Sequence, residues 1–216
     1  MYQQLHVLFN RLKRYSFQDI KQLEHVNNGI YLLFEKGEKY ESLDRVVRVG
    51  SHPSQNRFYA RLKDHFMDNH RKSIVRKHIG RCFLNDENDP YISVWDFSNT
   101  QVKKGSPGNK LINEEKEKNI NRRISDYLNN FSICVIPELN NDIQRMTLES
   151  KLITTLNLTD KNYISPNWLG KKHPNHKIAH SGLWNIQKLN DNNFISTNDF
   201  ELIQLKTKNE YTENSF

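Results

Sequence analysis

The stretch that decides the fold is Gly29-Ile30-Tyr31-Leu32-Leu33-Phe34, an apolar run that opens on a glycine. A second run, Arg45-Val46-Val47-Arg48-Val49-Gly50, follows a polar segment that contains Gly37. Valine, isoleucine and aromatic residues favour strands, and a short polar connection favours pairing of the two runs. We therefore expect strands over 29–34 and 45–50 that form a hairpin.

The spacing of apolar residues predicts the remaining elements. Helices are expected over 1–20, over 58–66 and 74–80 after Pro53, over 114–130 and over 142–158, where Asp142 is the expected N-cap. Strands are expected over 131–137 and 91–97, with shorter ones at 183–189 and 200–205. The expected fold class is α+β, and its central segments follow the order strand, strand, helix, helix, strand, helix.

Composition limits the classes of protein that the chain can form. At 216 residues the chain can bury a core as one elaborated domain. Cys82 and Cys134 lie in apolar, strand-like runs, and we expect both to be reduced core residues of a cytoplasmic protein. No run of about 18 apolar residues occurs, so no membrane span is expected. The first residues, 1–14, lack the apolar region of a secretory signal.

Most of the excess positive charge lies in one stretch. The chain has 32 Lys and Arg against 25 Asp and Glu, a net charge of +7. Residues 57–81 hold eight bases and two acids, a net charge of +6, together with three histidines. The bases are Arg57, Arg61, Lys63, Arg71, Lys72, Arg76, Lys77 and Arg81. This clustering is expected of a phosphate-binding face, and the alternative is a solvated helix surface.

One carboxylate falls where a helix should be apolar. At 100° per residue, Glu149 lies in the middle of the apolar side of the helix expected over 142–158. Burying an ionised carboxylate costs several kcal/mol, so a metal ion, an arginine or a proton must compensate it. Arg145, one turn earlier, would make this a structural ion pair, and a metal-binding or catalytic role is the other alternative.

A second pair combines a guanidinium with an imidazole. Arg61 and His65 are four residues apart and so share one face of a helix. A guanidinium holds a phosphate through two hydrogen bonds, and an imidazole can move a proton near neutral pH. The alternative is a solvated arginine beside a half-buried histidine.

In combination these residues resemble the GIY-YIG nuclease family. Gly29-Ile30-Tyr31 matches the first motif, and Arg48-Val49-Gly50 stands in the place of the second. The helix with Arg61 and His65 resembles the family's arginine-bearing helix, a later helix supplies Glu149, and the loop Ser165-Pro166-Asn167-Trp168 supplies Asn167. The order and spacing fit along roughly residues 28–170.

The resemblance implies a small three-stranded antiparallel sheet flanked by helices, in β-β-α-α-β-α order. It divides the chain into an N-terminal helical extension (1–27), a nuclease domain (28–170) with an insertion at about 85–130, and a C-terminal extension (171–216). It also implies one Mg²⁺ ion, for which Mn²⁺ could substitute, held by Glu149. Mg²⁺ keeps several waters, so a single carboxylate is chemically sufficient.

The resemblance also implies roles in hydrolysis of a DNA phosphodiester. Tyr31 would activate or position the attacking water, and His65 would assist that proton transfer. Arg61 would stabilise the phosphate as its charge develops, and Asn167 would position a phosphate oxygen or the metal-side loop. Arg48 replaces the usual tyrosine of the second motif; because it cannot act as a base, it would bind phosphate or mark a weakened site.

Other polar residues of the basic stretch are expected to contact DNA. His52 follows the second strand and would either compensate for Arg48 or be an ordinary loop residue. The expected phosphate contacts are His52, Arg57, Lys63, His70, Arg71, Lys72, Arg76 and Lys77. For His70 and Lys72, a non-specific contact with the DNA backbone is a simpler interpretation than a contact at the scissile phosphate.

These features predict an Mg²⁺-dependent endonuclease that cuts double-stranded DNA at a specific sequence, as restriction enzymes do. We see no separate DNA-reading domain in the sequence, and cutting both strands with one site per chain favours a homodimer. One alternative is a nuclease specific for branched or damaged DNA. A second is a catalytically weak DNA-binding module in which Arg48 marks lost chemistry.

Overall fold

A three-stranded antiparallel sheet forms the centre of the computed structural model, which describes residues 1–66, 70–157 and 163–211. Its strands are β1 (Gly29–Tyr40), β2 (Leu43–Gly50) and β3 (Phe131–Pro137), in the order β2-β1-β3. The predicted hairpin and third strand are confirmed, although β1 extends six residues beyond Phe34. The register places Tyr31 opposite Gly50 on one side and Val135 on the other.

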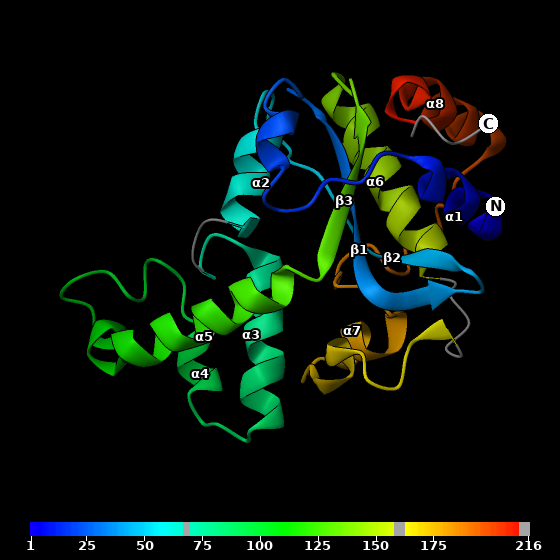
Figure 1. The fold of residues 1–216 in the computed structure, drawn as a ribbon. Coiled ribbons are helices and arrows are strands. Elements are labelled where there is room, and N and C mark those ends of the chain that lie inside the picture. The colour runs from blue at the N-terminus through cyan, green and yellow to red at the C-terminus, as the bar shows by residue number, and fades with distance from the viewer. Residues whose placement is uncertain (67–69, 158–162, 212–216) are drawn as a thin grey trace.

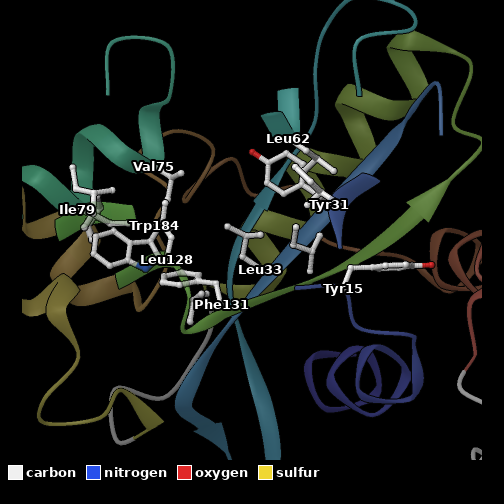
Figure 2. Packing of buried hydrophobic residues seen from close by; sticks show 14 of the residues in the cluster. Tyr15, Tyr31, Leu33, Leu62, Val75, Ile79, Leu128, Phe131 and Trp184 are labelled. Atoms are coloured by element: carbon white, nitrogen blue, oxygen red, sulfur yellow. The ribbon is translucent and has the colours of Figure 1, made fainter. Parts of the chain in front are cut away.

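Both faces of the sheet are covered, which explains why β1 is apolar at successive positions. On one face, Tyr31 and Leu33 belong to a core cluster that also contains Leu62, Val75 and Trp184 (Figure 2). On the other face lies a second cluster, to which Ile30, Leu32 and Phe34 contribute from β1. Alternation along one strand therefore directs Tyr31 toward the face that carries the arginine-bearing helix.

The helices divide between these two faces (Figure 1). Residues of α1 (Tyr2–Arg11), α6 (Asp142–Leu156) and α8 (Thr197–Lys206) pack into the second cluster. Residues of α2 (Phe58–Phe66), α3 (Ile74–Asp86), α4 (Ile92–Trp95), α5 (Glu114–Leu128) and α7 (His176–Ser181) pack into the first. Short 3₁₀ turns lie at Ile20–Leu23, Pro107–Leu111, Leu169–Lys172 and Lys208–Glu210.

Three predicted strands are wrong. The segment expected as a strand over 91–97 forms the short helix α4, in which the buried Trp95 stacks on His70 with ring centroids 3.5 Å apart. The segment at 200–205 lies within α8, which a capping box of Ser196 and Asp199 begins. The segment at 183–189 is not a strand, but Trp184 donates its backbone N–H to the carbonyl of Val47 at 2.7 Å and so lies along the edge of β2.

The predicted helix bounds also need correction. The first helix ends at Arg11 rather than near residue 20, and Leu12 and Tyr15 instead make isolated bridges to Tyr211 and Ile133. The second helix after Pro53 continues through Gly80, where an added Cβ would meet the ring of Trp95.

Two further details of the prediction change. Cys82 therefore lies in α3 and not in a strand-like run, yet both cysteines are free and buried as expected. The N-cap of α6 is Asn141 rather than Asp142, because the Asn141 side chain accepts the N–H of Gln144.

Candidate active site

A cavity of about 410 Å³ lies where β1, β2, α2, α3 and α6 meet. It is lined by Tyr31, Arg48, Gly50, Ser51, Pro53, Arg61, Ile74, His78, Arg81, Met146, Glu149, Ile153 and residues 184–188. Four of the six residues predicted to be catalytic line the cavity, namely Tyr31, Arg48, Arg61 and Glu149, and a fifth, His65, is buried against Tyr31. Among the residues that the structure describes, Glu149 is the only acid of this lining, against the bases Arg48, Arg61, Arg81 and Lys188.

Tyr31 and His65 form a buried pair at the floor of the cavity. The Tyr31 hydroxyl lies 2.7 Å from Nε2 of His65, and both side chains are almost fully buried. The Tyr31 ring passes over Gly50, its neighbour on β2, where any Cβ would collide with the ring. The glycine of the second motif is therefore required by the position of the tyrosine of the first.

The contacts around the pair orient the histidine. Arg48 donates its Nε–H to the Tyr31 oxygen at 3.4 Å, and the Ser73 hydroxyl lies 2.7 Å from Nδ1 of His65. Ser73 also caps α3 by accepting the N–H of Arg76. We assign the tautomer of His65 in which Tyr31 donates to Nε2 and Nδ1–H donates to Ser73.

Burial lowers the pKa of His65 well below its usual value, and the positive charges of Arg61, Arg48 and Arg76 add to that shift. His65 is therefore neutral at physiological pH, and its Nε2 can accept a proton. Arg61 is held half-buried at the cavity by donation to the carbonyl of Lys72 at 3.1 Å. Arg48 is buried and also donates to the carbonyl of Trp184.

Glu149 enters the same cavity from α6. Its side chain is 12% exposed, and its Oε2 accepts from the Ser51 hydroxyl at 2.8 Å and from the Lys188 ammonium at 3.3 Å. The structural ion pair that the sequence suggested with Arg145 does not form. Arg145 instead pairs with Asp142 and donates to the carbonyl oxygens of residues 52, 53 and 139.

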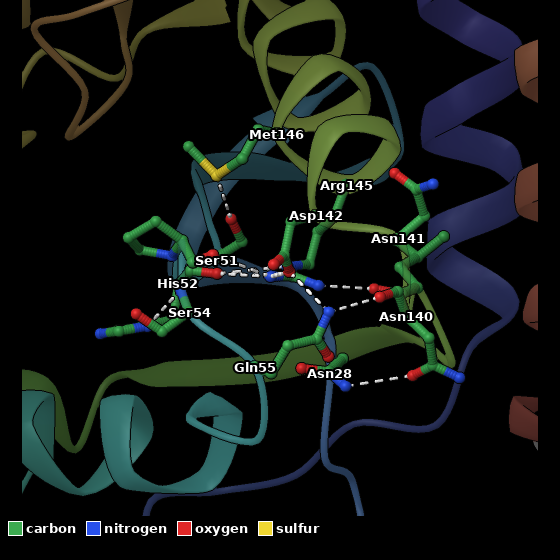
Figure 3. Close-up of polar contacts among 12 residues, drawn as sticks. Asn28, Ser51, His52, Ser54, Gln55, Asn140, Asn141, Asp142, Arg145 and Met146 are labelled. Atoms are coloured by element: carbon green, nitrogen blue, oxygen red, sulfur yellow. Dashed lines mark hydrogen bonds and ion pairs between the residues drawn. The ribbon is translucent and has the colours of Figure 1, made fainter.

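A polar network fixes the loop after β2 against the start of α6 (Figure 3). The Gln55 amide donates to the carbonyl of Asn140 at 2.6 Å and to Asp142 at 2.9 Å. Arg145 reaches the same loop through the carbonyl of His52, and Asn28 bonds to Asn140 at 3.1 Å. These contacts hold the helix that carries Glu149 at a set distance from the end of β2.

The donor set of the cavity fits a divalent cation that keeps most of its water. No group of three His, Cys, Asp or Glu side chains that could hold a metal is found among the described residues. Glu149 alone would hold the ion, which suits Mg²⁺ because this cation commonly uses one or two carboxylates, with water and substrate phosphate as its other ligands.

Three of the bases predicted to contact DNA lie inside the protein, and this expectation of an exposed basic face is corrected. His70 is buried against Trp95, and burial with nearby cationic side chains lowers its pKa to about 3. Arg71 makes a two-pronged ion pair with Glu117, and the buried Arg76 donates to α5 at the carbonyl of residue 121 and the hydroxyl of residue 125. Arg71, just before α3, and Arg76, within α3, therefore bind α5 rather than facing solvent.

The other predicted DNA contacts lie nearer the surface, and their role stays a prediction. Arg57, Lys63 and Lys72 are exposed. His52 is half-buried and accepts the N–H of residue 54, and Lys77 is half-buried and donates to the carbonyl of residue 96.

The structure brings Asn185, and not Asn167, to the cavity. Asn167 is exposed and is not among the lining residues. Asn185 is buried and bonds both the N–H and the carbonyl of Val49, at 3.2 and 2.9 Å. Its side chain therefore pairs with the edge of β2 as a backbone would. The strand predicted over 183–189 contains this residue, but nothing in that pattern assigned it to the site.

His78 and Arg81 are two further lining residues that sequence reasoning did not assign to the site. Nδ1 of His78 lies 3.0 Å from Nε2 of His173 and 3.1 Å from the Arg81 guanidinium. Nδ1 of His173 accepts the N–H of Asn175, so its Nε2–H donates to His78. His78 is therefore held with its proton on Nε2. Only the helical spacing of positions 74, 78 and 81, which places them on one side of α3, could have suggested them.

A family model described as GIY-YIG domain matches residues 1–206. The match includes the predicted N-terminal extension and residues 171–206 of the predicted C-terminal extension, which contributes residues 184–188 to the cavity. No curated protein and no solved structure matches the chain. In the described part of the chain, no helix is long and apolar enough to cross a membrane.

Proposed function

Because the chain belongs to the GIY-YIG family and is a nuclease by that membership, we propose that it is an Mg²⁺-dependent endonuclease that cuts double-stranded DNA at a specific sequence. One observation carries this proposal: the Tyr31–His65 pair and the carboxylate of Glu149 meet at a single cavity whose other charged residues are bases. This arrangement offers a proton acceptor, a cation ligand and phosphate-binding groups within one site.

Tyr31 and His65 would activate the attacking water. The phenol gives its proton to Nε2 of His65, and the phenolate accepts a proton from the water as it attacks phosphorus. Burial disfavours the imidazolium in the resting site, but a phosphate that enters the cavity brings negative charge that favours it. The hydrogen bond from Nδ1 to Ser73 keeps the ring in position during the transfer.

The arginines would stabilise charge rather than move protons. Arg48 donates to the Tyr31 oxygen and so supports the phenolate, which is why its presence in place of a tyrosine does not by itself imply an inactive site. Arg61 stands at the cavity with donors for the phosphate oxygens. When bound to Glu149, Mg²⁺ would supply Lewis-acid stabilisation of the phosphate and of the leaving oxygen.

Helices α3, α4 and α5 form a lobe beside the cavity, and this lobe supports the proposal of sequence-specific cutting. Residues of α3 line the cavity, and α4 and α5 pack beside α3 (Figure 1). DNA bound at the cavity would therefore meet this lobe, which offers a surface for base contacts outside the scissile phosphate. Cutting both strands of a duplex with one such cavity per chain favours a dimer.

Plasmid cleavage tests the function. Purified protein is incubated with circular plasmid and Mg²⁺, the cut ends are mapped, and Tyr31→Phe serves as the matched variant, because it removes one hydroxyl and keeps the ring. Discrete fragments that Tyr31→Phe does not produce support the proposal. Cutting only at branched or damaged DNA shows a structure-specific nuclease instead. No cutting with either Mg²⁺ or Mn²⁺ overturns the proposal.

A further inference from the structure

Lys188 stands at the rim of the cavity in an uncommon backbone conformation. Its φ is +63°, in the left-handed region that lysine seldom adopts. The Thr154 hydroxyl donates to the Lys188 carbonyl at 2.8 Å, and the Asn157 amide donates to the carbonyl of Leu189 at 2.8 Å. Both donors come from the end of α6. The helix that carries Glu149 therefore also holds Lys188 in this conformation.

This backbone directs the ammonium of Lys188 to the acid of the cavity. Nζ lies 3.3 Å from Oε2 of Glu149, and the Lys188 side chain is only 25% exposed. Ser51 donates to the same oxygen at 2.8 Å. The charge of Glu149 is thus compensated by a hydroxyl and an ammonium.

The three arginines of the cavity have other partners. Arg48 donates to Tyr31, Arg61 donates to the carbonyl of Lys72, and Arg81 is paired with Asp96 at 2.6 Å. Lys188 is the lining base that contacts the acid itself. A compact ammonium on a flexible stem can leave this contact more easily than a buried guanidinium could.

We propose that Lys188 competes with the divalent cation for Glu149 and is released when a DNA phosphate enters, so that cation and DNA bind cooperatively. The inference rests on the proposed function of the same site. An ammonium beside the carboxylate repels a dication, and this repulsion lowers the metal affinity of the site when no DNA is bound. A phosphodiester offers Lys188 a second anion and removes that repulsion. The effect is reciprocal, because a cation that raises the affinity for DNA has its own affinity raised equally by DNA.

The coupling gives the site a safeguard. Without DNA, Glu149 stays paired with Lys188, and the cation binds weakly. With DNA bound, the cation would offset the negative charges of the carboxylate and the phosphate, while Lys188 contacts the phosphate. Lys188 thus acts at two anions in turn, and its second partner is a phosphodiester oxygen.

Mn²⁺ binding, followed by electron paramagnetic resonance, tests the proposal without relying on cleavage. Lys188→Met removes the charge and keeps the stem, and Lys188→Asn removes the charge with a residue that tolerates a positive φ. Lys151→Met is the control, because it breaks a comparable ion pair of α6, with Asp199 at 2.8 Å, away from the cavity. Titrations with a short DNA duplex are repeated in a Tyr31→Phe background so that the duplex stays intact.

Without DNA, both Lys188 variants are expected to bind Mn²⁺ at least about fivefold more tightly than the wild type, the low end of measured couplings. The duplex should then tighten Mn²⁺ binding in the variants less than in the wild type, while Lys151→Met behaves as the wild type in both conditions. Unchanged or weaker Mn²⁺ binding by both variants overturns the competition. If plasmid cleavage is intact in that case, the nuclease proposal stands and only the role of Lys188 falls; absence of both Mn²⁺ binding and cleavage overturns both.

Discussion

Replacing Gly50 by alanine perturbs the proposed chemistry through a single methyl group. A Cβ at this position would lie 3.0 Å from Cε1 of Tyr31 and closer still to its Oη and Cζ. Ordinary carbon contacts begin at about 3.5 Å, so the ring must move. It lies between β2 and the buried His65, which leaves it little room to do so without changing the contact with Nε2.

The magnitude follows from two distances. The Tyr31–His65 contact of 2.7 Å ceases to be a hydrogen bond once its atoms separate by about 0.8 Å more. A misplacement of about 1 Å in a catalytic group typically costs about 100-fold in rate. Overpacking in a tight core costs about 1–3 kcal/mol of stability. Gly50→Ala should therefore fold, with a lower melting temperature, and lose about two orders of magnitude in cleavage rate.

Single-turnover cleavage and thermal unfolding measure the two effects separately. Gly170→Ala is the control, because its Cβ would also meet an aromatic ring, with three Trp168 atoms within 2.5 Å, outside the cavity. It should lose comparable stability and keep its cleavage rate. In a Tyr31→Phe background, Gly50→Ala should cost little further activity, because the hydroxyl is already absent. If Gly50→Ala cuts DNA as fast as Gly170→Ala does, the assigned role of the Tyr31–His65 contact is wrong.

Three further predictions concern the supports of the site. Ser73→Ala should slow cleavage, because it removes the hydroxyl that bonds Nδ1 of His65, while DNA affinity in a binding assay stays unchanged. Ser73→Thr keeps a hydroxyl at this position and should restore the rate. Asn185→Ala leaves buried backbone groups of β2 without partners, so unfolding in denaturant should show a loss of about 1–3 kcal/mol. Burial lowers the pKa of His6 to about 4 and that of His70 to about 3. Below pH 6.5 the unfolded chain binds protons that these two histidines do not bind in the folded protein. Each should therefore remove up to about 1.4 kcal/mol of stability per pH unit between pH 6 and 5, as denaturant titrations at these two pH values would show.

The sheet could be predicted because the local sequence pattern is enough to identify its strands. An apolar run over 29–34 and another over 45–50 have only one economical pairing, and Tyr31 and Gly50 become neighbours as a direct result. The segment at 91–97 has a strand-like composition, yet it contains the helix α4, whose Trp95 stacks on a histidine from another segment. Tertiary contacts of this kind are invisible to periodicity.

The site divides in the same way. Helical spacing places Glu149 on the apolar side of its helix and places Arg61 and His65 on one helix face. Site residues that lie on regular helices could therefore be predicted from the sequence. Lys188 and Asn185 lie on an irregular segment, and their position depends on long-range bonds to α6 and β2. The fate of Arg71, which is paired with a glutamate 46 residues away, likewise depends on the packing of α5. Charge clustering in the sequence cannot distinguish a DNA-facing base from one that joins two helices.

The most direct test of the account is the behaviour of Glu149→Gln with DNA. The amide keeps the size of the side chain and removes the charge that would hold a cation. DNA binding is measured without a divalent cation and single-turnover cleavage with Mg²⁺, using the DNA that the wild type cuts. We predict binding at least as tight as that of the wild type, because one negative charge leaves a cavity of bases, with no detectable cutting. Cleavage at the wild-type rate by Glu149→Gln would contradict the assignment of this cavity as the active site.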